Sequence, residues 1–228
     1  MKRRIPPYLN SFLIAIVFSL AACSKADLKK PTTVRFGFKY NSTLESGFHF
    51  TQGNANISNI VIEGYRVEGD DIYFNRPFSS PISTDLNGSS EIQDFIFDIP
   101  QGDYNQLSFS CLLKNLGETP SLSISGLYHG SMVPLNITFN LDTDQFFDLT
   151  VLGKNQNQVV LNHEQSRTAD VIFNTDYWFS SITSTMMDNA VVETVNGLDH
   201  VTISSTQNTT IYNAVINRLN HTDEAIIN

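Results

Sequence analysis

Apolar and polar residues alternate through most of this chain, and this pattern limits its fold more than any other feature. Between residues 34 and 173 the alternation has a period of two, which is typical of β-strands that bury one face. Three segments show it best: VRFGFKY from Val34, LSFSCLL from Leu107 and LNITFNL from Leu135. Weaker patterns of the same kind cover residues 57–67, 72–74, 92–99, 122–128, 147–151 and 169–173.

Turn residues separate these patterns. Glycine lies between strand patterns in EGDD at 68–71 and in PQGDY at 100–104, as hairpin connections require. Many short strands with no helical period between them favour an antiparallel sheet over a parallel nucleotide-binding sheet. We therefore predict a mainly β fold, with an antiparallel β-sandwich domain over residues 34–173.

After Phe173 the periodicity changes to that of a helix. Residues 174–190 predict an amphipathic helix, because its apolar positions, Trp178, Ile182 and Met186, are four apart. Either Thr175 or Asp176 is expected to cap its start.

A second helix is predicted further along, with Asn208 as its cap and a stripe formed by Ile211, Val215 and Leu219. Residues 200–204 between the two helices suggest a short strand. We therefore expect residues 174–228 to form a C-terminal helical segment packed on the sandwich.

The N-terminus has the pattern of a signal peptide. Basic residues at 2–4 precede a short apolar run at 12–20, which is shorter than the roughly 20 residues that a spanning helix needs. The next residues, Leu20-Ala21-Ala22-Cys23, resemble the lipobox of bacterial lipoproteins.

This resemblance implies that Cys23 is lipidated and becomes the first residue of the mature chain. Residues 1–22 would then be the signal peptide and residues 23–33 a flexible tether, with two or three acyl chains making the anchoring lasting. The alternative is ordinary secretion, with cleavage after Ser19-Leu20-Ala21.

The expected location is the outer membrane, at its periplasmic face or at the cell surface, because Ser24 follows Cys23 where an inner-membrane lipoprotein would carry aspartate. The order of lipobox, β domain and helical tail resembles that of uncharacterised Bacteroidota envelope lipoproteins. The stretch IPQGDYNQLSF at 99–109 is similar to a turn that leads into a strand in many of them.

Composition excludes some classes of partner. The formal net charge is −9, so the surface is expected to repel nucleic acid. The hydrophobic share of 41% indicates a folded domain. If Cys23 carries lipid, Cys111 has no cysteine to pair with, and its place on an apolar strand face predicts a buried, inert thiol.

No catalytic, metal or cofactor site is predicted. The five histidines occur singly, no zinc spacing is found, and no G-x-S-x-G elbow is present. Two groups of oxygen ligands could suit calcium, but neither matches the twelve-residue calcium loop, so solvated turns are the favoured interpretation. The groups are Asp142, Asp144 and Asp148, and Asp85, Asn87 and Glu91.

These observations predict a non-catalytic envelope protein that binds a partner protein or a glycan or has a structural role. The alternative is an envelope hydrolase with a dispersed site. The ligand-binding residues are not identified, but loops at 75–90, 115–121 and 153–158 are candidates. Exposed aromatic rings can stack on sugars, and Tyr65, Tyr73 and Tyr128 are the candidates if their rings face solvent. Trp178 is instead expected in the core.

Overall fold

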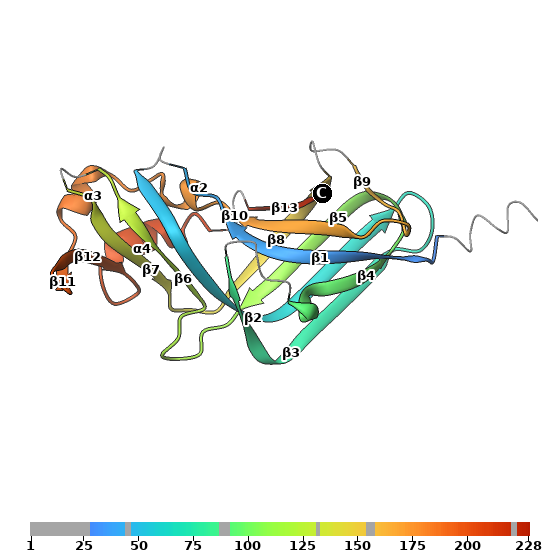
Figure 1. Cartoon of the computed structure of the whole chain (residues 1–228), viewed down its shortest axis with the longest axis horizontal. Coiled ribbons are helices and arrows are strands. Elements are labelled where there is room, and N and C mark those ends of the chain that lie inside the picture. The colour runs from blue at the N-terminus through green and yellow to red at the C-terminus, as the bar shows by residue number, and fades with distance from the viewer. Residues whose placement is uncertain (1–27, 44–46, 87–91, 131–132, 154–157, 220–222) are drawn as a thin grey trace, which may run out of the picture.

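The computed structural model describes residues 28–43, 47–86, 92–130, 133–153, 158–219 and 223–228. It confirms a mainly β protein, and the molecule is elongated (Figure 1). In these described residues, thirteen strands form one large sheet. They are β1 (Pro31–Tyr40), β2 (Phe48–Arg66), β3 (Ile72–Asp85), β4 (Ile96–Pro100), β5 (Gly102–Leu113), β6 (Leu122–Tyr128), β7 (Leu135–Leu141), β8 (Gln145–Gly153), β9 (Val159–Leu161), β10 (Arg167–Phe173), β11 (Glu193–Val195), β12 (Leu198–Ile203) and β13 (Glu224–Ile227).

The long strand β2 joins the two ends of the molecule. Its residues 48–55 pair with β6 and its residues 57–66 pair with β5. Strand β3 pairs with one edge of β2 over residues 54–64, so β5 and β6 must both pair with the other edge. On that edge β6 ends and β5 begins at Asn56. The amide of Asn56 donates to Ser121 O, and its carbonyl accepts from the amide of Lys114. In Figure 1 strand β2 bends near this point.

The sheet is mixed, so the prediction of a purely antiparallel sheet is wrong. Strand β1 runs parallel to β10, β12 parallel to β7, and β13 parallel to β8. Alternation reports which face of a strand is buried and carries no information on the direction of its neighbour. The sheet is strongly curled, and the two-layer sandwich stays a prediction.

The buried faces are those that the alternation indicates. Phe36 of β1 and Phe109 of β5 are both almost fully buried, and their rings stack with centroids 4.7 Å apart. Cys111 is 1% exposed, as predicted. Strand β1 begins at Pro31, so three residues of the predicted tether belong to the sheet.

The segment after β10 contains two short helices where one was predicted. These are α2 (Thr175–Phe179) and α3 (Ser184–Asp188). The expected N-caps are also wrong, because the amide of Tyr177 donates to Asn174 Oδ1 at 3.1 Å. The carboxylate of Asp176 instead accepts from the amide of Thr43, which connects α2 to the loop after β1.

The second predicted helix is α4 (Thr209–Ile216), and the strand expected at 200–204 overlaps β12. A short 3-10 helix, η1 (Gln93–Phe95), precedes β4. Residues 174–228 also supply strands: β11 and β12 extend one end of the sheet, and β13 lies between β8 and β10. This part of the chain is therefore built into the sheet as well as packed on it.

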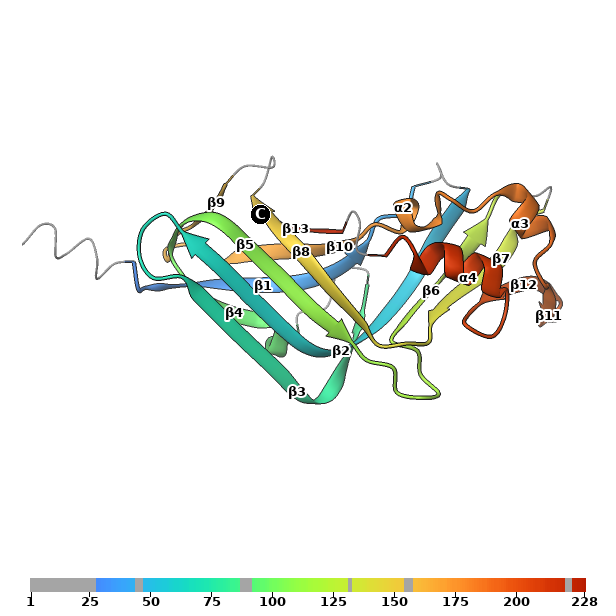
Figure 2. The ribbon, with the colours of Figure 1, turned by 180° about the vertical axis from the view of Figure 1, so that it is seen from behind.

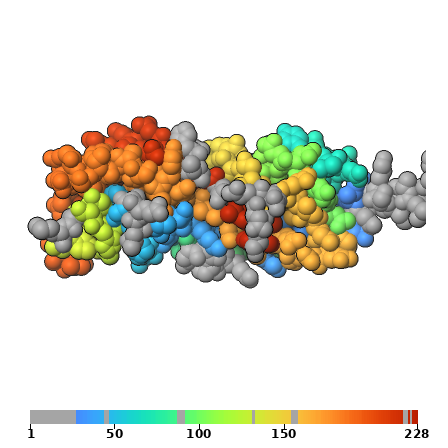
Figure 3. All heavy atoms as spheres, turned by 90° about the horizontal axis from the view of Figure 1, so that it is seen from above, coloured from blue at the N-terminus to red at the C-terminus, as the bar shows by residue number. Residues whose placement is uncertain are grey.

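The helices cover one face of the sheet at the β6–β7–β12 end of the molecule (Figure 2). The ring of Phe179 in α2 packs against Phe48, Phe50 and Phe139 of the sheet, and Tyr212 of α4 stacks on Phe139. Seen from above, residues coloured orange to red form much of the surface at this end (Figure 3). No helix of the described part of the chain lies on the opposite, outer face of these strands.

Candidate functional site

The outer face of β2, β6, β7 and β12 carries a row of uncharged polar side chains. The strand register places Gln52 opposite Ser125, Ser125 opposite Thr138, and Thr138 opposite Thr202. The residues on either side of Thr138 and Thr202 are buried, so alternation places these two side chains on the outer face. The strand pairing places Ser125 and Gln52 in the same row.

Two open hollows of about 370 Å³ each lie on this face and share Thr51, Gln52 and Ser125. We call the combined surface the polar groove. The first hollow is also lined by Gly53, Asn54, Asp85 and Ser123. The second is also lined by Gly126, Leu127, Asn136, Ile137, Thr138, Val195, Asn196, Leu198 and His200.

Hydrogen bonds between strands fix the positions of several groove side chains. The hydroxyls of Ser125 and Thr138 lie 2.9 Å apart. Similar contacts join Ser123 Oγ to Asn140 Oδ1 at 2.8 Å and Ser83 Oγ to Asn54 Oδ1 at 3.0 Å. A ligand therefore meets hydroxyl and amide groups that are already ordered, which lowers the entropy cost of binding.

The groove is neutral to weakly acidic. Among the described residues that line it, none is Lys or Arg, and Asp85 is the carboxylate. It therefore lacks the charge-assisted donors that bind phosphate or carboxylate groups. Its chemistry suits a ligand that carries uncharged hydroxyl, amide or carbonyl groups.

An apolar rim borders one end of the groove. Val195 and Leu198 face each other across the β11–β12 hairpin and are 48% and 61% exposed. The turn between them is Asn196-Gly197, with φ angles of 53° and 78°, as a two-residue type I′ turn requires. The hairpin thus presents two aliphatic side chains beside the polar floor.

Gly126 allows the groove strands to approach closely beside a β-bulge in β2. The register between β2 and β6 shifts between Phe50 and Gln52. A Cβ atom added at Gly126 would lie 2.0 Å from His49 O and 2.6 Å from Phe50 Cα, both backbone atoms.

We expect Gly126→Ala to lower the free energy of unfolding by about 3 kcal/mol, because the backbone of β2 must move to admit the methyl group. Gly117→Ala is the matched control, since no atom lies within 4 Å of its added Cβ and its cost is about 1 kcal/mol from φ +83° alone. Urea denaturation of both variants measures the difference. Equal losses would show that the close approach at Gly126 carries no cost.

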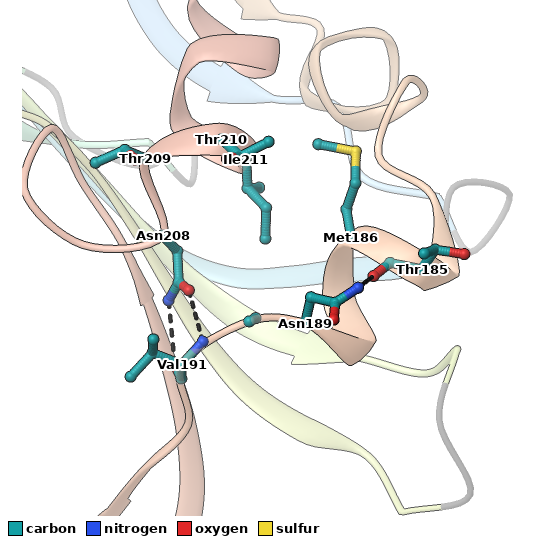
Figure 4. A pocket seen from close by; sticks show the side chains of 9 residues that line it. Thr185, Met186, Asn189, Val191, Asn208, Thr209, Thr210 and Ile211 are labelled. Atoms are coloured by element: carbon teal, nitrogen blue, oxygen red, sulfur yellow. Dashed lines mark hydrogen bonds between the residues drawn. The ribbon is translucent and has the colours of Figure 1, made fainter.

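A second pocket, of about 390 Å³, lies between α3 and α4 on the helix side (Figure 4). Asn208, predicted as the cap of α4, has a left-handed φ of 52° and makes no side-chain capping bond. Its side chain instead accepts from the amide of Val191 at 2.7 Å and donates to Val191 O at 3.2 Å and Thr202 O at 2.7 Å. Asn208 therefore fastens the chain before the hairpin to the end of β12.

The carboxylates considered for calcium are engaged in structural contacts. Asp144 pairs with Lys114 at 2.5 Å and accepts from the amide of Asn115, and the bond from Lys114 holds the pKa of Asp144 below its usual value. Asp142 accepts from the amide of Ser205. Asp148 accepts from Ser110 Oγ.

Asn87 and Glu91, from the second predicted group, lie outside the described residues. Within the described part of the chain, no three His, Cys, Asp or Glu residues gather closely enough to hold a metal ion.

Other residues singled out from the sequence fall in different places. Trp178 and Tyr128 are buried, whereas Tyr65 and Tyr73 are 50% and 64% exposed. Burial raises the pKa of the Cys111 thiol far above its usual value, which fits an inert side chain. Cys23 lies outside the described residues.

Of the described residues in the loops predicted for recognition, Asp85 alone lines the polar groove. Residues 75–85 of the first candidate loop belong to strand β3. The groove residues lie on strand faces, which the prediction of loops does not include. A sign of them is present in LSISGLY and LNITFNL, where the outward positions are Ser, Thr and Asn, with Leu127, rather than the Lys and Glu usual on solvated strands.

None of the described helices is long and apolar enough to cross a membrane. Comparison with protein-family models, curated proteins and solved structures finds no match to the chain.

Proposed function

We propose that this protein is a lipid-anchored protein of the bacterial cell envelope that binds an uncharged glycan in the polar groove and does not catalyse a reaction. The proposal is carried by one observation: the groove presents ordered hydroxyl and amide groups, and none of its described lining residues is basic.

The dimensions and chemistry of the groove support a saccharide. Each hollow falls within the roughly 300–1,000 Å³ range of small-molecule sites. Sugar hydroxyls both donate and accept hydrogen bonds, as do the hydroxyls of Ser125 and Thr138 and the amide of Gln52. The aliphatic rim offers contact to the C–H groups of a sugar.

The anchor part of the proposal depends on the LAAC motif at residues 20–23. Strand β1 begins at Pro31, a short distance along the chain from Cys23. With Cys23 lipidated, the folded domain would stay close to the outer membrane, at its periplasmic face or at the cell surface. A neutral groove on an acidic chain suits envelope polysaccharide better than nucleic acid.

The test uses residues 24–228 as a soluble protein, titrated calorimetrically with a panel of uncharged oligosaccharides. We expect the double variant Ser125→Ala, Thr138→Val to weaken binding about ten-fold, because each hydroxyl contributes about 0.5–1.5 kcal/mol. Both replacements keep the strand shape. Thr150→Val, at an exposed position of β8 away from the groove, is the control and should bind normally.

Absence of binding to every uncharged glycan, or equal loss in the Thr150 control, would contradict the proposal. Turnover of a glycan by the purified protein, abolished by one substitution, would instead support the alternative of an envelope hydrolase.

A further inference from the structure

We infer that the polar groove selects sugars that carry an acetamido group over sugars that carry a hydroxyl at the same position. This inference deepens the proposed function and depends on it. It is based on the pairing of an aliphatic rim with an amide-bearing floor in one hollow.

The rim is aliphatic rather than aromatic. Aromatic rings offer a flat surface that stacks on the face of a sugar ring, and none of the described lining residues is Phe, Tyr or Trp. Val195 and Leu198 instead present branched methyl groups that are about half exposed. Such a surface is suited to a small apolar group on the ligand, and the methyl of an acetamide is one.

The polar side chains next to the rim supply hydrogen-bond partners for the N–H and carbonyl of the same acetamido group. Asn136 lines this hollow, and its Nδ2 donates to Asp199 O at 3.2 Å. Its Oδ1 accepts no hydrogen bond from the described residues and is available to the N–H of an acetamide. Because Ser125 and Thr138 share one hydrogen bond, one of their two hydroxyls can donate to its carbonyl, as can the amide of Gln52.

The rim is held in place from two sides. The type I′ turn fixes Val195 against Leu198 within the hairpin. Before the hairpin, Asn208 binds both the amide and the carbonyl of Val191, as the dashed lines of Figure 4 show. A rim ordered before binding loses little entropy when a methyl group packs on it.

The test compares chitotetraose with cellotetraose on the soluble protein of residues 24–228. The two probes share length and linkage and differ in an acetamide or a hydroxyl on each sugar. We expect chitotetraose to bind about four-fold tighter, the factor that burial of one further methyl group gives.

The rim variants separate this inference from the proposed function. Val195→Thr and Leu198→Asn should each remove the preference, so that the variant binds chitotetraose and cellotetraose with equal affinity. Val160→Thr, at a valine of β9 with similar exposure, is the matched control and should retain the preference.

Four results would overturn the inference. Equal affinity for the two probes, or a preference that survives both rim variants, overturns it and leaves the proposed function standing. Binding of another uncharged glycan, but of neither probe, also overturns the inference and leaves the proposed function standing. Failure of every uncharged glycan to bind overturns the proposed function as well.

Discussion

Replacing Phe179 by alanine is expected to lower the free energy of unfolding by about 4 kcal/mol, because it removes a fully buried ring and leaves a cavity. The ring centroid lies 4.9 Å from that of Phe48, 4.8 Å from Phe50 and 5.6 Å from Phe139. These rings come from β2 and β7, so Phe179 joins helix α2 to the inner face of the groove strands.

Chemical denaturation measured by circular dichroism checks this value. Phe146→Ala is the matched control, because it removes a phenylalanine ring of β8 that is 49% exposed. Its removal should cost less than about 1 kcal/mol. A loss at Phe179 no larger than that at Phe146 would show that the helices do not stabilise the sheet.

Cys23→Ala is expected to abolish lipid attachment completely, because the thiol of Cys23 is the proposed acceptor of the diacylglycerol group. Metabolic labelling with a fatty-acid probe, followed by membrane fractionation, measures the effect. The wild-type chain should carry label and sediment with membranes, whereas the variant should carry none.

Cys111→Ala is the control for this experiment. Its thiol is buried in the core, so this variant should be labelled as strongly as the wild type. Label that persists on the Cys23 variant, or a wild-type chain without label, would rule out the proposed anchor and favour ordinary secretion.

The sequence alone determined which side of the clearly alternating strands faces the core. The period-two pattern placed Phe109, Cys111 and Leu113 inside, and all three are buried. Burial of one face is a local property, since the pleat sends successive side chains to opposite sides whatever lies next to the strand. The same pattern also places the Ser, Thr and Asn residues of the groove on the outward side, but it does not indicate that they come together to form a groove.

Only the tertiary structure decided which strands are neighbours and in which direction they run. Strand β13 lies between β8 and β10, and β12 lies beside β7, so the C-terminal segment completes a sheet begun far earlier in the chain. Long-range pairing depends on chain connections and on the shape of the whole core, neither of which appears in local periodicity. The groove follows from that pairing, because Gln52, Ser125, Thr138 and Leu198 come from four strands that meet only when the sheet has formed.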